Sequence, residues 1–295
     1  MSELLEEMKE IAEAVNEELD KLLPVPKTPE GRLVEAMRYS AISNGKKMRP
    51  FLLIKSAALF DVPRSVSIRL AAALEMVHIY SLIHDDLPCM DNDDLRHGQE
   101  SCHKKFDETT ALLAGDALLT RAFDVIADEK TSPDAVIRCQ LIMELARAAG
   151  ATGMMGGQML DMMAANLDMD LVEVTRLQQM KTGRLISFAC EAGAILGKST
   201  FNERQLLKEY AKDIGLAFQI TDDLLDVEGT VEEMGKSVRK DVDASKATFV
   251  SFVGVDEAKK QANSLVENAI SKLTPFGEKA ASLRLLALFI THRRY

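Results

Sequence analysis

The chain has 295 residues, of which 47% are hydrophobic, 28% are charged and 5% are aromatic, and it contains no tryptophan. A chain of this length can bury a substantial core, and no linker rich in Pro, Gly or Ser divides it, so we expect one domain over residues 1–295. The formal net charge of −10 argues against nucleic acid as the main partner, because binding to a phosphate backbone requires a basic face.

The composition and the first twenty residues both favour helices. Met, Leu, Ala and Glu are plentiful and proline is scarce, which predicts an all-α fold. The acidic start lacks the positive charge of a signal peptide, and no run approaches about 18 uninterrupted apolar residues, so we expect a cytoplasmic protein without a membrane span. Apolar side chains recur at the helical period near the N-terminus, as is typical of a packing face: Leu4, Leu5, Met8, Ile11, Ala12, Val15 and Leu19.

Four groups of cations lie beside glycine, proline or acidic residues, where helices tend to end. Arginine offers a planar fork to phosphate oxygens, and lysine offers a point charge. Most of the 36 lysines and arginines must be ordinary surface charges, but these groups predict a phosphorylated ligand. They are Lys46, Lys47 and Arg49 in NGKKMRP; Arg96; Lys181 and Arg184 in KTGR; and Lys236, Arg239, Lys240 and Lys246.

The first aspartate cluster is HDDLPCMDNDDLR, residues 84–96, and it follows an apolar stretch. Asp85 and Asp91 are six residues apart, which would place them about 240° around a straight helix. Pro88 lies between them and cannot continue a regular helical ladder, so it predicts a bulge or kink that turns Asp91 back toward Asp85. A solvated acidic helix end is the alternative for any single run of this kind.

Other metal sites fit this sequence less well. His84 and Asp85 form a doublet that can be a metal pair in phosphohydrolases, with His78 as a further candidate ligand. That reading would leave the second aspartate cluster without a purpose. The four cysteines have no CxxC spacing and are expected to be reduced thiols: Cys89, Cys102, Cys139 and Cys190.

Three glycines, Gly153, Gly156 and Gly157, lie in apolar helical sequence, where each costs up to about 1 kcal/mol relative to alanine. Close approach of a neighbouring helix would compensate, and so would access for a substrate. Asp161 would face a cavity in the second case and make a helix-to-helix hydrogen bond in the first.

The second aspartate cluster is QITDDLLD, residues 219–226, again preceded by apolar sequence. On a helix Asp222 and Asp226 share a face one turn apart. So many like charges are unfavourable together unless cations neutralise them. Hard oxygen ligands without Cys or His point to Mg²⁺, which is typically held by a few carboxylates and by substrate phosphates.

Six strings occur along residues 30 to 250 in the order GKKMRP, SLIHDDLPCMDNDDLRHG, GGQMLD, KTGRLI, FQITDDLLD and GKSVRKD. Together they resemble the motif series of the trans-isoprenyl diphosphate synthases, with the first aspartate motif in the DDxxxxD form. The Tyr80-Ser81 pair ahead of this motif resembles the bacterial short-chain members that make farnesyl diphosphate. One departure is that Arg96 is followed by His97, where many relatives have a second arginine.

The resemblance implies a prenyltransferase that condenses isopentenyl diphosphate with dimethylallyl and geranyl diphosphate to give farnesyl diphosphate. A geranyl or geranylgeranyl diphosphate synthase is the alternative. The implied metal ligands, for about three Mg²⁺ per active site, are Asp85, Asp91 and Asp222. Asp86 and Asp226 would lie nearby, either as partial ligands or as residues that contact the ligands without binding metal directly. The implied contacts to isopentenyl diphosphate are Lys46, Arg49, His78 and, more weakly, His97. The implied cations at the allylic diphosphate are Arg96, Lys181, Lys236 and Lys246.

The resemblance also assigns roles along the hydrocarbon chain. Thr182 and Gln219 would stabilise the allylic cation through their dipoles, and Tyr80 with Ser81 would form the floor that limits product length. The implied fold is a single large helical bundle around a central active-site cavity, the isoprenoid synthase type I fold, in a homodimer. A non-catalytic helical regulatory subunit is a remote alternative, but such subunits tend to lose an aspartate motif. A terpene cyclase would lack the GKKMR site.

Overall fold

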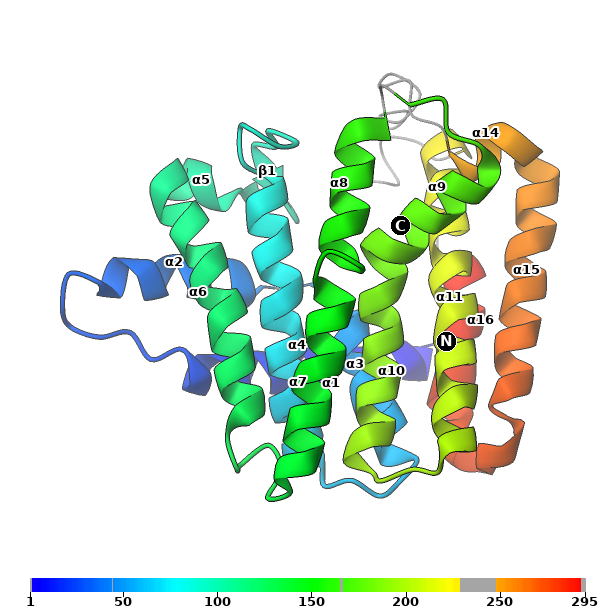
Figure 1. Ribbon diagram of the computed structural model, residues 1–295, viewed down its shortest axis with the longest axis horizontal. Coiled ribbons are helices and arrows are strands. Elements are labelled where there is room, and N and C mark those ends of the chain that lie inside the picture. The colour runs from blue at the N-terminus through cyan, green and yellow to red at the C-terminus, as the bar shows by residue number, and fades with distance from the viewer. Residues whose placement is uncertain (1, 44, 165–166, 229–247, 293–295) are drawn as a thin grey trace. The chain divides into compact units, whose positions relative to one another are not determined.

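The computed structural model describes residues 2–43, 45–164, 167–228 and 248–292. These residues are helical almost throughout, so the prediction of an all-α fold is confirmed (Figure 1). The one sheet in this part of the chain is a hairpin of β1 (Leu95–Arg96) and β2 (Gln99–Glu100).

Contacts divide the chain into two compact units. We call Ser2–Met143 with Ile195–Gly197 the N-terminal unit, and Glu144–Ala194 with Lys198–Tyr295 the C-terminal unit. One domain over residues 1–295 stays a prediction.

The N-terminal unit is built around α4, which contacts α1, α3 and α6. Nearly every residue of α4 from Leu70 to Ile83 is buried, so this helix has no polar face over that stretch. By length and composition it is apolar enough to cross a membrane, but 72% of the apolar window is buried within the protein, as in a core helix. The helices of this unit are α1 (Ser2–Leu22), α2 (Gly31–Ala41), α3 (Met48–Ala58), α4 (Arg64–Asp85), α5 (Cys102–Lys105), α6 (Glu108–Ala127) and most of α7 (Ala135–Ala149).

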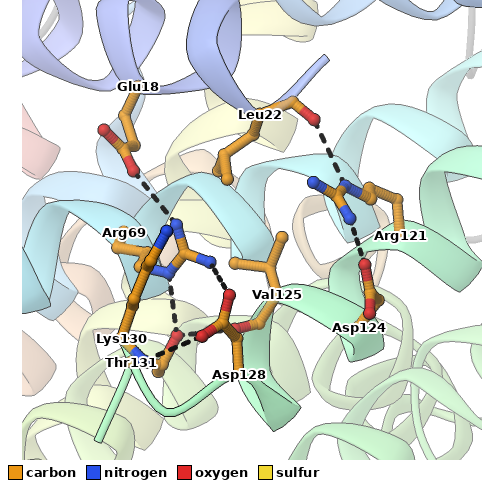
Figure 2. Close-up of polar contacts among 9 residues, drawn as sticks. All are labelled: Glu18, Leu22, Arg69, Arg121, Asp124, Val125, Asp128, Lys130 and Thr131. Atoms are coloured by element: carbon orange, nitrogen blue, oxygen red, sulfur yellow. Dashed lines mark hydrogen bonds and ion pairs between the residues drawn. The ribbon is translucent and has the colours of Figure 1, made fainter. Parts of the chain in front are cut away.

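Polar contacts fix the first turns of α4 (Figure 2). At 1.5 Å per residue, Arg69 lies about 24 Å along the helix from Asp85. Arg69 donates from Nη2 to Oδ2 of Asp128 at 2.8 Å and from Nε to Oγ1 of Thr131 at 3.2 Å, and Nη1 lies 3.5 Å from Oε1 of Glu18. Thr131 in turn donates to the carbonyl oxygen of Val125 at 2.6 Å. One arginine thus joins α1, α4 and the end of α6, which fixes α4 against its neighbours.

The C-terminal unit is built around α11, which contacts α15, α16 and the π-helical turn η1. This long helix carries the second aspartate cluster, and η1 interrupts the otherwise α-helical run of α9 and α10. The elements of this unit are α8 (Met154–Ala164), α9 (Leu171–Gln178), η1 (Gln179–Gly183), most of α10 (Arg184–Leu196), α11 (Phe201–Glu228), α14 (Phe249–Val253), α15 (Val255–Lys272), the 3-10 turn η2 (Thr274–Ala280) and α16 (Ala281–His292).

Gly157 has a packing role. A Cβ added to Gly157 would lie 2.2 Å from the backbone nitrogen of Lys181, so only glycine lets α8 approach η1 this closely. Cβ atoms added to Gly153 and Gly156 would instead meet two nearby carbonyl oxygens, that of Ala148 at the end of α7 at 2.1 Å and that of Ala151 in the turn before α8 at 2.0 Å. Close approach of backbone therefore explains these three glycines.

Candidate functional site

The first aspartate motif lies where α4 ends. Asp85 is the last residue of the helix, and the chain then turns so that the backbone N–H of Asp91 donates to the carbonyl oxygen of Asp85 at 2.8 Å. Asn92 closes the turn with a positive φ of 52°, which asparagine tolerates better than most residues. The expected return of Asp91 toward Asp85 is therefore confirmed at the level of the backbone. It is achieved by ending the helix at Asp85 rather than by kinking it at Pro88.

Asp86 is turned inward and is 2% exposed. Its carboxylate forms an ion pair with the guanidinium of Arg96. Nε of Arg96 donates to Oδ1 at 3.0 Å and to Oδ2 at 3.3 Å, and Nη2 also donates to Oδ1. Burial raises the pKa of Asp86, and the hydrogen bond and charge of Arg96 oppose that rise. The structure thus pairs Arg96, an expected diphosphate contact, with the second aspartate of the motif. Its contact with substrate stays a prediction.

His97 lies at the tip of the β1–β2 hairpin. His97 and Gly98 have φ values of 51° and 79°, the positive values that a two-residue type I′ turn requires at both central positions. The hairpin brings this tip next to the GKKMRP segment, since a Cβ added to Gly45 would lie 3.9 Å from Cε1 of the His97 ring. Two segments that are about fifty residues apart in the sequence therefore meet here.

Cations gather around His78 on α4. Nη1 of Arg49 lies 3.2 Å from Nε2 of His78, which accepts this hydrogen bond in its neutral form. Burial lowers the pKa of His78 well below its usual value, and the positive charges of Arg49, Lys47 and Arg96 lower it further. Three of the expected isopentenyl diphosphate contacts, Arg49, His78 and His97, thus lie together with Arg96 in a positive field.

The two lysines of GKKMRP have different environments. Lys47 is buried, and its Nζ lies 3.2 Å from both Oε1 of Glu75 and the carbonyl oxygen of Ala41, so it serves as an internal ion pair. Lys46 is exposed. Lys47 is therefore committed to an internal pair, and the contact of Lys46 with isopentenyl diphosphate stays a prediction.

Tyr80 and Ser81 lie within α4 ahead of Asp85. Tyr80 is 3% exposed, its ring packs edge-on against His84 with centroids 5.8 Å apart, and burial and the charge of Asp85 raise its pKa to about 12. Ser81 donates from Oγ to the carbonyl oxygen of His78 at 2.8 Å. The serine hydroxyl is therefore used within its own helix, and the aromatic ring is the bulkier candidate for a floor.

His84 packs against α6 rather than pairing with Asp85 around a metal. Its Nε2 lies 3.0 Å from the carbonyl oxygen of Leu112, and a Cβ added to Gly115 would lie 2.2 Å from the same nitrogen. Gly115 thus makes room for the imidazole at the α4–α6 contact. This use of His84 disfavours the phosphohydrolase alternative.

The second aspartate motif distributes its three carboxylates between two faces of α11. Asp222 and Asp226 are half-buried on one face, whereas Asp223 is only 8% exposed. Oδ2 of Asp223 accepts from Nε2 of Gln178 at 3.1 Å and from the backbone N–H of Phe249 at 2.9 Å. Asp223 therefore joins α11 to the end of α9 and to the start of α14.

Asp226 carries a buried oxygen, Oδ2, that has no hydrogen-bond partner among the described residues. Buried polar atoms are normally satisfied, and a carboxylate oxygen left over beside a second carboxylate fits a hard cation or its bound water. Asp222 and Asp226 thus fit Mg²⁺. Within the described ranges, no group of three or more His, Cys, Asp or Glu side chains is arranged to hold a metal by itself.

The expected catalytic residues Lys181 and Thr182 lie in η1, which packs against α11. Turns of π-helix inside α-helices are frequent at functional sites. Nζ of Lys181 lies 2.8 Å from Oδ2 of Asp161 on α8, so the open question about Asp161 is settled in favour of a contact between helices. Gln219 is half-buried on α11, three residues before Asp222. Lys236, Arg239, Lys240 and Lys246 lie outside the described residues.

Gln158 on α8 is a site candidate that we did not single out from the sequence. Both polar atoms of its amide are buried and lack hydrogen-bond partners in the described part of the chain. Gln158 lies next to Gly157, where α8 meets the backbone of Lys181. The GGQMLD string marks this segment, but burial of the amide could not be read from it.

A cavity of about 860 Å³ lies in the C-terminal unit between α7, α10 and α11. It touches η1 through Gln179 and Gly183, but none of Lys181, Thr182, Gln219 and Asp222 lines it. Its wall alternates acidic and basic side chains, including Glu191 paired with Lys208 at 3.1 Å. A central cavity lined by both aspartate motifs stays a prediction.

Known proteins resemble this chain over nearly its whole length. The sequence profile of the Polyprenyl synthetase family matches residues 30–284. Farnesyl diphosphate synthase of Escherichia coli is 41% identical over 92% of this chain and 91% of its own length. Geranylgeranyl pyrophosphate synthase 9 of Arabidopsis thaliana is 42% identical over 96% of this chain and 79% of its own length. The crystal structure of an FPP/GFPP synthase from Zymomonas mobilis superimposes with a TM-score of 0.91 at 47% identity, covering 98% of this chain and all of that one.

Proposed function

Because this chain belongs to the polyprenyl synthetase family, we propose that it is the prenyltransferase that extends dimethylallyl and geranyl diphosphate by isopentenyl diphosphate, with farnesyl diphosphate as the main product. The observation that supports a site for isopentenyl diphosphate is the gathering of Arg49, His78 and His97 in the N-terminal unit. Such a field attracts a diphosphate despite the negative net charge of the chain, because a ligand meets the local potential.

Magnesium is the cation that these donors would hold. Asp85 and Asp91 in the N-terminal unit, and Asp222 with Asp226 in the C-terminal unit, supply only oxygen ligands, which suits Mg²⁺. When bound, Mg²⁺ withdraws charge from the leaving diphosphate. Arg96 and Lys181 would each add positive charge to a leaving diphosphate, and Lys236 and Lys246 are proposed for the same task.

The reaction follows from what these side chains can do. The C–O bond of the allylic diphosphate breaks to give an allylic cation and diphosphate, and Thr182 and Gln219 face the cation with their dipoles. Lys46, Arg49 and His78 hold isopentenyl diphosphate so that its double bond attacks the cation and forms the new C–C bond. Loss of a proton to the released diphosphate completes a chain that is five carbons longer. No side-chain nucleophile is required.

A geranylgeranyl product is the second candidate, because relatives of both product classes match this chain at about the same identity. Tyr80, buried one to two turns ahead of Asp85, supports the shorter product. We also propose that the enzyme is a homodimer of the cytoplasm, as the resemblance implies. Sedimentation at twice the mass of one chain would support the dimer, and sedimentation at a single mass would contradict it.

The test is incubation with radiolabelled isopentenyl diphosphate, an allylic starter and Mg²⁺, followed by chromatography of the dephosphorylated products. We expect a fifteen-carbon alcohol, loss of product on chelation, and its return when Mg²⁺ is added. A twenty-carbon main product would replace the farnesyl assignment with the second candidate. No labelled product from any starter, in a folded protein, would contradict a prenyltransferase.

A further inference from the structure

Lys47 begins α3 in a backbone conformation that lysine rarely adopts. Its φ of 43° and ψ of 50° are left-handed, and a positive φ is uncommon for residues other than glycine. A conformation of this kind persists only where the surrounding structure fixes it. The carbonyl oxygen of Lys47 accepts a hydrogen bond from the backbone N–H of Phe51 at 3.0 Å, so this residue sets the direction in which α3 starts.

The side chain of Lys47 shows what fixes this turn. It is fully buried, and its Nζ lies 3.2 Å from both the carbonyl oxygen of Ala41 and Oε1 of Glu75. Ala41 is the last residue of α2, and Glu75 lies in the middle of α4, where it is 4% exposed. One ammonium group therefore joins the end of α2, the start of α3 and the middle of α4.

The same face of α4 also holds Arg49. Glu75 and His78 are three residues apart on this helix, so their side chains lie on one face. Lys47 is bonded to Glu75, and Nη1 of Arg49 is bonded to Nε2 of His78, with 3.2 Å between the bonded atoms in each pair. The first turn of α3 is thus attached to α4 at two points about one helical turn apart.

The burial of this ion pair favours a role in geometry over a role in stability. Removing two charges from water costs about as much as their attraction returns, so a buried pair contributes little net stability. The charges of Lys47 and Glu75 also cancel, so the pair adds little net charge to the site. What the pair does provide is a defined place for the turn that carries Arg49.

We propose that Glu75 and Lys47 are positioning residues for isopentenyl diphosphate. Glu75 holds Lys47, and Lys47 holds the first turn of α3 so that Arg49 meets the diphosphate in a fixed place. The inference rests on the proposed function, in which Arg49 and His78 bind this substrate. It gives a role in the reaction to the lysine of GKKMRP that is buried away from ligands.

The test replaces both partners at once. Lys47→Met combined with Glu75→Met puts apolar side chains of similar volume in place of the ion pair, a change that is often neutral for stability. The net charge of the protein stays the same, so a loss of affinity would come from position and not from charge. Equilibrium dialysis of radiolabelled isopentenyl diphosphate measures that affinity without turnover. We expect its Kd to rise by about tenfold or more, since a displacement of about 1 Å can cost on the order of 100-fold.

Steady-state kinetics give a second readout that a purely structural pair would not change. The KM for isopentenyl diphosphate should rise together with the Kd, while kcat and the KM for geranyl diphosphate stay within about twofold of the wild type, as expected for the loss of uniform binding of one substrate.

Arg69→Met is the matched control. Arg69 is a largely buried charge on the same helix, and its ion pair with Asp128 lies in the first turns of α4. This variant should lower Tm and leave the Kd and both KM values at wild-type level. An equal rise of the Kd in Arg69→Met would show a general loosening of α4 and overturn the inference.

The remaining outcomes separate the inference from the proposed function. A folded double variant that binds isopentenyl diphosphate as tightly as the wild type overturns the inference alone. A double variant that fails to fold would assign the pair to the fold itself, which also overturns the inference. A wild-type protein that binds no isopentenyl diphosphate overturns the proposed function and the inference together.

Discussion

At the scale of single residues, the local field decides what each titratable group can do. Burial lowers the pKa of His97 below its usual value, and the charges of Arg96 and Lys47 act in the same direction against Glu75 and Asp86. The imidazole is therefore neutral at pH 7, where a second arginine would be charged. This difference gives the departure from the family pattern a measurable consequence.

His97→Arg is expected to lower the KM for isopentenyl diphosphate at pH 7 by about two- to fivefold, the effect of one partly exposed ion pair. In the wild type, protonation of His97 adds charge only as pH falls below the usual pKa of about 6.5, so the difference between the two proteins should shrink toward pH 5.5. His97→Gln, which never charges, is the control and should stay at the high KM. A constant ratio of KM values across this pH range would mean that His97 does not reach the diphosphate.

Tyr80→Ala is expected to shift the main product from fifteen carbons toward twenty or more. Tyr80 lies five residues before Asp85, about 7.5 Å along α4, a distance comparable with one or two isoprene units. Removal of the buried ring should also destabilise the protein by about 3 to 5 kcal/mol. Ser81→Ala is the matched control, since its hydroxyl is bonded within α4. An unchanged product from a folded, active Tyr80→Ala enzyme would rule out Tyr80 as the floor.

At the scale of secondary structure elements, the π-helical turn η1 depends on the closeness of its neighbours. α8 approaches it at Gly157, and α11 approaches it at Gly215, where an added Cβ would lie 3.5 Å from Cα of Gly183. The first distance leaves no room for a methyl group, and the second is an ordinary van der Waals contact. We therefore expect substitution by alanine to have opposite effects on stability at the two glycines.

Gly157→Ala should lower the free energy of unfolding and reduce kcat, because the new methyl group pushes α8 away from the backbone of Lys181 and disturbs its ion pair with Asp161. Gly215→Ala should leave stability unchanged or raise it by up to about 1 kcal/mol, the helical preference of alanine over glycine. Chemical denaturation and steady-state kinetics of both variants make the measurement. Equal stability of the two variants would contradict the close approach at Gly157.

At the scale of the whole molecule, the net charge of the chain does not indicate the charge of its ligand. The chain carries ten formal negative charges in excess, yet the cations around His78 form a local positive field. A diphosphate with Mg²⁺ is expected to bind the folded protein and not the unfolded chain. Binding of that kind stabilises the folded state by mass action.

Addition of Mg²⁺ and inorganic diphosphate together should raise Tm by about 5 °C or more. At 100 times its Kd a ligand contributes about 2.7 kcal/mol, and for a chain of this size each kcal/mol shifts Tm by roughly 2 °C. Mg²⁺ neutralises both the carboxylates and the diphosphate, which repel each other without it. Either component added alone should therefore raise Tm much less than the two together. Asp222→Asn should lose most of the joint shift. Full shifts from diphosphate without Mg²⁺ would contradict metal-bridged binding.

The amino-acid sequence by itself predicted the helical fold and the family, which are confirmed, and it provided the grounds on which we propose hard-oxygen metal chemistry and a phosphorylated ligand. The apolar period predicts the helices, the Asp-Asp doublets indicate the metal chemistry, and cations beside glycine and proline indicate the phosphorylated ligand, whereas the family was inferred from the resemblance of six strings to a known motif series. The all-α fold and the family could be predicted without knowing which residues contact one another over long distances in the sequence.

Only the tertiary structure decided which member of each similar pair has an internal role. Lys47 is buried against Glu75 while Lys46 is exposed, and Asp223 accepts from Gln178, 45 residues earlier, while Asp222 does not share that bond. Neighbouring residues of the same type have the same local pattern, so nothing in the sequence separates them. Their environments differ because helix packing turns one side chain toward partners that are distant along the chain, where burial makes an unpaired charge too costly.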